Sequence, residues 1–223
     1  MIHNRSVTAL LPIKDHSERV PGKNFREFSG EPLYYHIVAT LDKTYAVDEI
    51  LIDTDSRRVI NEAPTLSRKV RILERPEELR GDDVSTNRIF AYDLEHSDAD
   101  LYLQTHATNP LVRAETFAQA LATFLQNEEK YDSLFGVNAY QSRFYDAEGR
   151  AVNHDPNELI RTQELPPLYE ENSCVYVFTK QSFEKRQQRI GERPYMFVTP
   201  EVESIDIDDE FRFKIAEILA MYG

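Results

Sequence analysis

The sequence predicts a three-layer α/β protein, in which helices cover both faces of a mainly parallel sheet. Apolar runs of strand length alternate with amphipathic helical segments through most of the 223 residues, which is the pattern that such sheets produce. The length suffices for one large α/β domain, so we expect residues 1–223 to form a single domain. Residues 140–172 break the alternation and are expected to form an inserted arm.

Three strands and two helices are expected in the first half of the chain. Residues 6–13 are an apolar run and the expected first strand. Residues 33–41 carry apolar side chains one turn apart, which predicts a short helix. Residues 48–54 and 69–73 are the next two strands, and residues 86–95 the second helix.

The second half of the chain continues the alternation, apart from the arm. Residues 100–104, 132–137 and 174–179 are expected strands. Residues 114–125 are the clearest helix, because four large apolar side chains fall on one stripe. Residues 209–221 are expected to close the chain as a helix. Its inward side chains are predicted to be Phe211, Ile215, Ile218 and Leu219.

The composition limits which kinds of partner the protein can bind and in which cellular compartment we expect it. The formal net charge of −13 argues against nucleic acid, whose phosphates need a basic surface, although a nucleotide needs only a local basic pocket or a metal. No apolar stretch approaches the roughly 20 residues of a membrane span, and the N-terminus lacks a signal-peptide pattern. The single cysteine, Cys174, fits a reducing compartment. We therefore expect a cytoplasmic protein with no membrane contact.

The first candidate site is the cationic loop that follows the first strand, within residues 8–24. A loop at the carboxyl end of a parallel strand can offer backbone N–H groups to phosphate, and here Lys14, Arg19 and Lys23 add positive charge. It is not a Walker loop, since no Ser or Thr follows Lys23, and Gly22 lacks the partner glycines of a dinucleotide fingerprint. Taken alone, the segment is equally compatible with an ordinary exposed basic loop.

Further motifs along the chain favour phosphate binding by this loop. The loop resembles the signature A-R-x-x-S-K-R-x-P-x-K-N of the acylneuraminate cytidylyltransferase family, whose members activate sialic-acid-like sugars with CTP. The resemblance covers nearly the whole chain, and it implies a Rossmann-like fold of the nucleotide-diphospho-sugar transferase type with a small dimerisation arm. The other matching segments are R-P-E-E-L at 75–79 with Asp82 and Ser85, L-Q at 103–104 with T-N-P-L at 108–111, R-T-Q-E-L-P-P at 161–167 with Asn172, and S-I-D-I-D at 204–208.

The resemblance implies that a sugar oxygen attacks the α-phosphate of CTP and expels pyrophosphate, with Mg²⁺ as the cofactor. It implies catalytic roles for Lys14, Lys23, Asp206 and Asp208, the last two as the metal ligands. It implies nucleotide binding by Ser17, Arg19, Asn24, Arg75, Asp82 and Ser85. It implies contacts with an acidic sugar from Gln104, Asn109, Arg161, Gln163 and Asn172.

Asp206 and Asp208 also point to a metal from their own pattern. They alternate with two isoleucines, so on a strand both carboxylates would share one face. Two close carboxylates repel each other unless a cation or a proton lies between them, and carboxylate oxygens suit Mg²⁺. The alternative is a strand that ends in helix-capping aspartates, a role that Asp209 already fills.

Several residues depart from the family pattern. Lys14 replaces the usual Arg and Glu18 a frequent Lys, while Thr162 and Glu170 stand where arginines are common. The sugar side has therefore lost positive charge, which leaves open a different sugar or a degenerate homologue that binds a nucleotide without catalysis. The loop after the fourth strand is two residues longer than usual, so His106 is an extra group, either a hydrogen-bonded loop histidine or a general base.

Residues 140–172 are expected to mediate dimerisation. The segment is polar, contains Asp155-Pro156-Asn157 and Pro166-Pro167, and has no helical period. Long irregular segments inside a compact domain are commonly functional. In the resembled family this region packs against a second subunit and completes its neighbour's sugar pocket, which implies a homodimer here.

Overall fold

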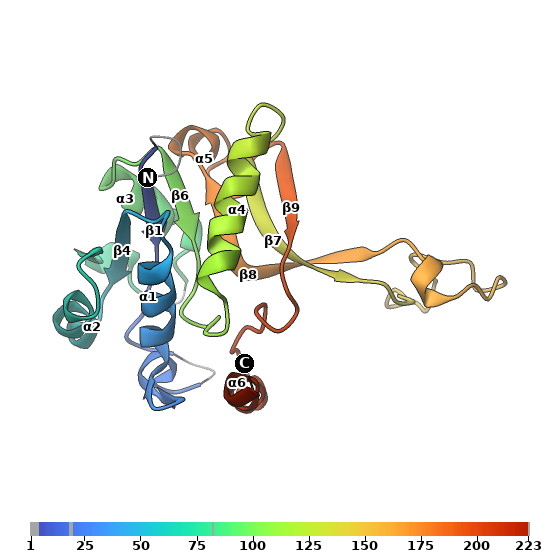
Figure 1. The fold of residues 1–223 in the computed structure, drawn as a ribbon, viewed down its shortest axis with the longest axis horizontal. Coiled ribbons are helices and arrows are strands. Elements are labelled where there is room, and N and C mark those ends of the chain that lie inside the picture. The colour runs from blue at the N-terminus through green and yellow to red at the C-terminus, as the bar shows by residue number, and fades with distance from the viewer. Residues whose placement is uncertain (1–4, 18–19, 82, 223) are drawn as a thin grey trace.

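Seven strands, in the order β5-β4-β1-β6-β8-β7-β9, form the central sheet of the computed structural model, which describes residues 5–17, 20–81 and 83–222 (Figure 1). Among these strands β8 alone runs antiparallel to its neighbours β6 and β7, so the expected mainly parallel sheet is confirmed. The strands are β1 (Val7–Leu10), β4 (Glu49–Thr54), β5 (Val70–Glu74), β6 (Leu101–Gln104), β7 (Ser133–Tyr140), β8 (Leu168–Phe178) and β9 (Pro194–Val198), and the short β2 (Glu27–Phe28) and β3 (Glu31–Pro32) form a separate hairpin.

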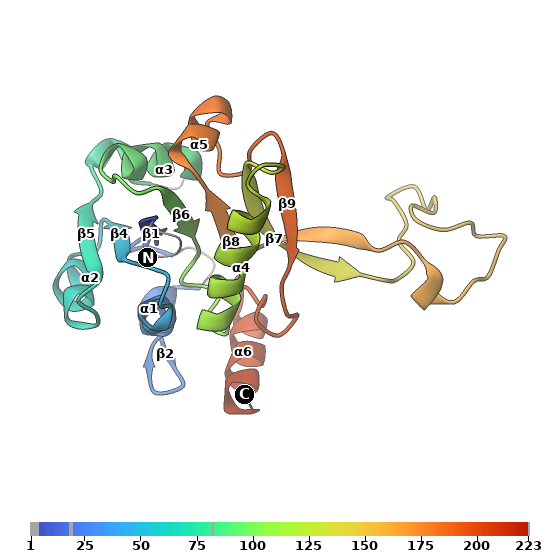
Figure 2. The ribbon, with the colours of Figure 1, turned by 45° about the horizontal axis from the view of Figure 1, so that its top comes forward.

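Helices cover both faces of this sheet and complete the expected three layers (Figures 1 and 2). Helices α1, α2 and α4 pack on one face and α3 and α5 on the other, because side chains alternate along each strand: Ala9 lies in the first core and Leu10 in the second. None of the described helices combines the length and apolar character that a membrane crossing needs. The helices are α1 (Leu33–Lys43), α2 (Arg57–Glu62), α3 (Thr86–Glu95), α4 (Ala114–Asn127), α5 (Lys180–Arg186) and α6 (Glu210–Tyr222), with 3₁₀ turns at Lys23–Phe25, Ala63–Thr65, Glu77–Leu79 and Thr162–Glu164.

The arm is a long β-ribbon that projects from the sheet (Figures 1 and 2). Its base is regular, because β7 continues to Tyr140 and pairs there with Leu168, the first residue of β8. The expectation of an irregular segment throughout 140–172 was therefore wrong at both ends. The outward side chains of these two strand ends are polar, so the alternation of apolar and polar residues that predicts a strand is not visible there in the sequence.

The last helix packs differently from the prediction. Phe213 and Ala216 are its buried residues, in a third core with Phe28. Phe211 and Ile218, which were expected to face inward, are 71% and 55% exposed. Apolar residues surround α6 on several sides, so its sequence could not identify the buried face. Helix α5 and strand β9 were not predicted; both are short, and α5 is also polar.

A buried cluster of ionisable groups links β4, the end of β5 and α3. Arg75 is fully buried and donates from Nε to Asp53, and its Nη2 donates to the Asp53 carbonyl oxygen at 3.2 Å. Asp93 lies beside Asp53, and both of its oxygens are buried without a donor among the described residues. Burial, and then the neighbouring Asp53, raise the pKa of Asp93 to about 9. Asp93 is therefore protonated at neutral pH and shares its proton with Asp53.

Replacing Asp93 with Asn removes this titration. Because the folded-state pKa of Asp93 lies above its unfolded value, the folded state holds the extra proton, and stability falls by up to about 1.4 kcal/mol per pH unit as the pH rises from about 4 to about 9. The Asn amide can donate to Asp53 without titrating, so Asp93→Asn raises the melting temperature at pH 7 and flattens its pH dependence. Melting curves over this range test it, with the exposed Asp98→Asn as control. An unchanged pH slope contradicts the shared proton.

Candidate active site

The loops after β1, β5 and β6 and the segment before α6 enclose a cavity of about 360 Å³ at one edge of the sheet. This is the edge where open α/β sheets bind ligands. The structure thus gathers residues that are far apart in the chain, from Pro12 to Asp208. The predicted site residues that line the cavity are Lys14, Ser17, Lys23, Asn24, Arg75, Asp206 and Asp208.

The cationic loop is folded back on itself and on the C-terminal acids. Gly22 adopts the left-handed conformation, with φ of 62°, and this turns the chain into the 3₁₀ turn that contains Lys23 and Asn24. Asn24 donates to the carbonyl oxygen of Lys14 at 3.0 Å. Lys23 is nearly buried: its Nζ donates to the Ile207 carbonyl oxygen at 2.6 Å and lies 3.9 Å from a carboxylate oxygen of Asp208. Lys23 is therefore not an ordinary exposed loop lysine.

Asp206 and Asp208 both face the cavity, although the strand that was expected to present them does not exist. The described segment 205–208 pairs with no strand. One backbone–backbone hydrogen bond holds it, from the Ile207 N–H to the Thr108 carbonyl oxygen at 2.9 Å. Burial of Ile207 turns the two acids to the other side. Asp209 caps α6 by accepting from the Arg212 N–H at 2.7 Å, so capping does not account for the other two acids.

This acid pair fits a divalent cation. Oδ1 of Asp206 is buried and has no hydrogen-bond donor among the described residues, and an acceptor left without a donor suits a cation. No group of three or more His, Cys, Asp or Glu side chains in the described part of the chain could hold a metal. Mg²⁺ often uses one or two carboxylates and completes its shell with phosphate oxygens and water, so the pair would hold the metal together with a bound triphosphate.

Arg75 lines the cavity from the end of β5, where Asp53 fixes its buried guanidinium. Ser85 precedes α3, but its side chain makes no capping hydrogen bond. Arg19 and Asp82, the remaining predicted nucleotide-binding residues, lie outside the described residues, as does Glu18.

A second cavity of about 780 Å³ adjoins the first. Ser173, Asp206 and Asp208 line both, so the acid pair lies at the boundary between them. Asn172 lines the second cavity and donates to Asn138 and Thr199 at 3.0 and 2.8 Å. The two cavities provide adjoining spaces for two ligands that meet at the acids.

The predicted sugar-contacting residues are only partly brought together. Asn109 accepts from the Ser173 hydroxyl at 3.0 Å and donates to the Ile205 carbonyl oxygen at 3.3 Å, so it supports the acid segment. Arg161 and Gln163 lie on the exposed arm, where Arg161 pairs with Glu164 (Figure 1). The base of the arm, with Tyr140 and Glu170, lines the second cavity, whereas the rest of the arm projects away from the sheet (Figure 1).

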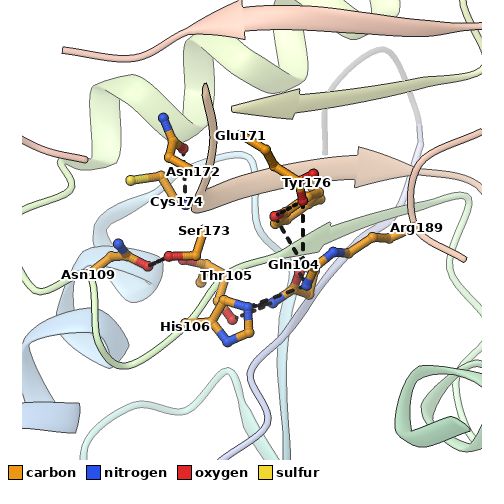
Figure 3. Close-up of polar contacts among 10 residues, drawn as sticks. All are labelled: Gln104, Thr105, His106, Asn109, Glu171, Asn172, Ser173, Cys174, Tyr176 and Arg189. Carbon is orange, nitrogen blue, oxygen red and sulfur yellow. Dashed lines mark hydrogen bonds and ion pairs between the residues drawn. The ribbon is translucent and has the colours of Figure 1, made fainter. Parts of the chain in front are cut away.

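Sequence reasoning missed a polar network behind the cavities, centred on Arg189 (Figure 3). Arg189 stacks 3.7 Å from the centre of the Tyr176 ring and donates to Tyr176 Oη at 3.0 Å and Gln104 Oε1 at 2.7 Å. Gln104 in turn contacts His106, which lines the first cavity. Burial, Arg189 and Lys23 lower the pKa of His106 to about 3, so its ring is neutral. An arginine in an unpredicted loop gives no sequence signal of this role.

Several known proteins are similar to this chain over nearly its whole length. A pseudaminic acid cytidylyltransferase from Campylobacter jejuni is 24% identical over 94% of this chain and 94% of its own length. A CMP-N,N'-diacetyllegionaminic acid synthase from Legionella pneumophila is 26% identical over 96% of this chain and 95% of its own. The solved structure of a CMP:2-keto-3-deoxy-manno-octonic acid synthetase complexed with CTP is similar in fold, with a TM-score of 0.69 and 15% identity over 97% of this chain and 99% of that one.

A family model also matches the chain, from the first strand to the last helix. The model describes cytidylyltransferases and spans residues 8–213. That range includes the cationic loop, Gln104 and the acid pair. The chain therefore belongs to the cytidylyltransferase family.

Proposed function

We propose that this cytidylyltransferase transfers CMP from CTP to an acidic, nonulosonate-like sugar and releases pyrophosphate. The observation that carries the proposal is the position of Asp206 and Asp208, at the boundary of two adjoining cavities and beside Lys23. The names of the two relatives give pseudaminic acid and diacetyllegionaminic acid as their sugars, and the similar solved structure contains CTP. The reaction would take place in the cytoplasm.

The smaller cavity is the proposed CTP site. The triphosphate would be held by Lys14, Lys23 and the hydroxyl of Ser17. Arg75, which Asp53 keeps rigid, would face the cytosine and donate to its O2 and N3 acceptors. Asp206 and Asp208 would hold Mg²⁺, which when bound neutralises charge that develops on the phosphates. Lys23, which the Ile207 carbonyl oxygen holds beside Asp208, would contribute a fixed positive charge without any reorganisation.

The larger cavity is the proposed sugar site. Its wall contains Asn172, Ser173 and Tyr176, and Gln104 pairs with Tyr176 on the neighbouring strand. A sugar held there would direct its attacking oxygen across the acid pair toward the α-phosphate. The arm of a second subunit would supply Arg161 and Gln163, which lie far from the cavity of their own chain (Figure 1).

One observation favours a second candidate, the same transfer to a sugar without a carboxylate. Glu170 and Glu171 line the larger cavity at positions where an acidic sugar would meet negative charge. Hydrogen bonds from Tyr140 to Glu170 and from Tyr176 to Glu171 hold these carboxylates in place, at 2.8 and 2.7 Å. Turnover assays with neutral and acidic sugars separate the two candidates.

Replacing Asp206 with Asn lowers turnover on the order of 10³-fold or more, because the charged metal ligand is lost while the side-chain size is kept. CTP binding through the loop survives in part, and the melting temperature does not fall, since Oδ1 of Asp206 has no hydrogen bond to lose among the described residues. Pyrophosphate release at several Mg²⁺ concentrations tests this. The control is Asp209→Asn, which keeps the cap of α6. Full Mg²⁺-dependent turnover in Asp206→Asn would remove this acid from the site.

The parent protein binds CTP at least about tenfold more tightly than ATP or GTP, because the Arg75 end of a cavity of about 360 Å³ suits a pyrimidine better than a purine. Isothermal titration calorimetry with each nucleotide and Mg²⁺ measures the difference. Equal or tighter binding of ATP counts against cytidylyl transfer.

The full chain forms a homodimer through the arm, because the arm exposes large apolar side chains that water disfavours. Leu159 is 89% exposed, and Tyr145 and Val152 are 55% and 54% exposed. Light scattering after size-exclusion chromatography is expected to give a dimer for the parent and a smaller species for Leu159→Asp. Gln187→Asp, at an exposed position outside the arm, is the control. A monomeric parent contradicts the proposal.

A further inference from the structure

The hydrogen bonds around Gln104 fix the positions of its protons. Arginine can only donate, so the Gln104 atom that lies 2.7 Å from Arg189 Nη1 must be the amide oxygen. A backbone carbonyl can only accept, so the atom 2.8 Å from the Thr105 oxygen must be the amide nitrogen. The two contacts agree, and the orientation of this amide is settled from both sides (Figure 3).

This orientation determines the tautomer of His106. The second amide proton of Gln104 points to His106 Nε2 at 3.0 Å, and Arg189 Nη1 lies 3.4 Å from the same nitrogen. Both groups donate, so Nε2 must accept and carries no proton. A neutral histidine then has its proton on Nδ1. The low pKa of His106 agrees with a neutral ring.

The Nδ1–H group is available to a ligand. His106 lines the smaller cavity together with Lys23 and Asp208, whose charges both act on its ring. Nδ1 makes no hydrogen bond to any other residue in the described ranges, and in Figure 3 it points away from the network. The Nδ1–H donor therefore has no acceptor among the described residues, at a cavity that Lys23 and Asp208 also line.

We propose that His106 is a fixed neutral hydrogen-bond donor, which Gln104 and Arg189 orient so that Nδ1–H contacts an anionic oxygen of a bound substrate. The oxygen belongs either to a nucleotide phosphate or to a sugar carboxylate, and the inference rests on the proposed function of this site. His106 is not a general base, because Nδ1 already carries a proton and Nε2 can accept one only by giving up Gln104. Arg189 acts through Gln104 as a positioning residue.

The hydrogen bonds that hold Arg189 in place also have fixed donors and acceptors. Its Nη2 donates to Tyr176 Oη, which uses its own proton to donate to Glu171 at 2.7 Å. The guanidinium stacks on the Tyr176 ring and is only 21% exposed. Each proton in the series of hydrogen bonds from Glu171 to His106 thus has one acceptor. These side chains can therefore donate and accept in only one pattern.

The tautomer can be measured without any substrate. In protein labelled with ¹⁵N-histidine, long-range ¹H–¹⁵N correlations distinguish a protonated ring nitrogen from an unprotonated one, and the spectrum of His106→Asn assigns the signals. At pH 7 His106 is expected to carry its proton on Nδ1. Arg189→Met frees the Gln104 amide, so a mixture of tautomers is expected there. A proton on Nε2, or on both nitrogens, in the parent overturns the proposal.

Ligand binding tests the donor itself. His106→Ala is expected to weaken binding of CTP or of the sugar on the order of tenfold, the usual size for a hydrogen bond to a charged group. His106→Asn retains an amide N–H near Nδ1 and loses less, while the exposed His96→Ala, at the end of α3, loses nothing. A weaker CTP affinity by calorimetry identifies the phosphate; a raised KM for the sugar with unchanged CTP affinity identifies the carboxylate.

If neither quantity changes in His106→Ala, His106 is not a substrate ligand and the inference is wrong. If the parent binds no CTP at all, the proposed function fails, whereas the Nδ1 tautomer measured in the free protein still stands or falls on its own spectrum. The two failures are therefore distinguishable.

Discussion

The site depends on the bond between Lys23 Nζ and the Ile207 carbonyl oxygen, which joins segments 184 residues apart. In the described part of the loop after β1, an isolated bridge from Ile13 to Thr54 precedes the turn at Gly22, and the segment before α6 has no strand partner. The bond from Lys23 ties these two irregular segments to each other. A nearly buried ammonium needs acceptors, and the Ile207 carbonyl and Asp208 satisfy that need. The same charge that orders the two segments stands beside the acids on which a triphosphate and a metal would lie.

The reversal of strand direction between β6 and β8 explains why two cavities adjoin. Gln104 ends β6, and Tyr176 pairs with it from the antiparallel β8, which enters the sheet from the arm side through Asn172 and Ser173. Residues from both strands therefore reach the same edge, where a purely parallel continuation would bring a crossover helix. The smaller cavity lies at the ends of β1 and β6, and the larger cavity lies beside β8.

The sequence predicted the sheet and most of the loops of the site because these depend on local pattern. The order of the sheet strands up to β7 and of α1, α3 and α4 follows from alternating apolar runs, whereas α2 and the β2–β3 hairpin were not predicted. The G-K-N and D-I-D segments line the smaller cavity, as the motifs predicted. What it could not predict depends on contacts between distant segments. The burial of Phe213 rather than Phe211 requires knowledge of Phe28, and the burial of Lys23 requires knowledge of Ile207. Arg189 follows the short helix α5, and no periodicity predicts its stacking on Tyr176.

The departures from the family pattern lie on both sides of the acid pair: Lys14 and Glu18 in the cationic loop, and Thr162 and Glu170 on the arm side. On the nucleotide side Lys23, Asn24 and Arg75 are retained and well anchored. On the sugar side Glu170 stands where an arginine is common, and the extra His106 is tied through Gln104 to Arg189. A chain that only bound a nucleotide would have little use for two clustered acids, so the presence of Asp206 and Asp208 beside Lys23 favours catalysis. The departure at Glu170, which lines the larger cavity, bears on which sugar would bind there rather than on the nucleotide chemistry.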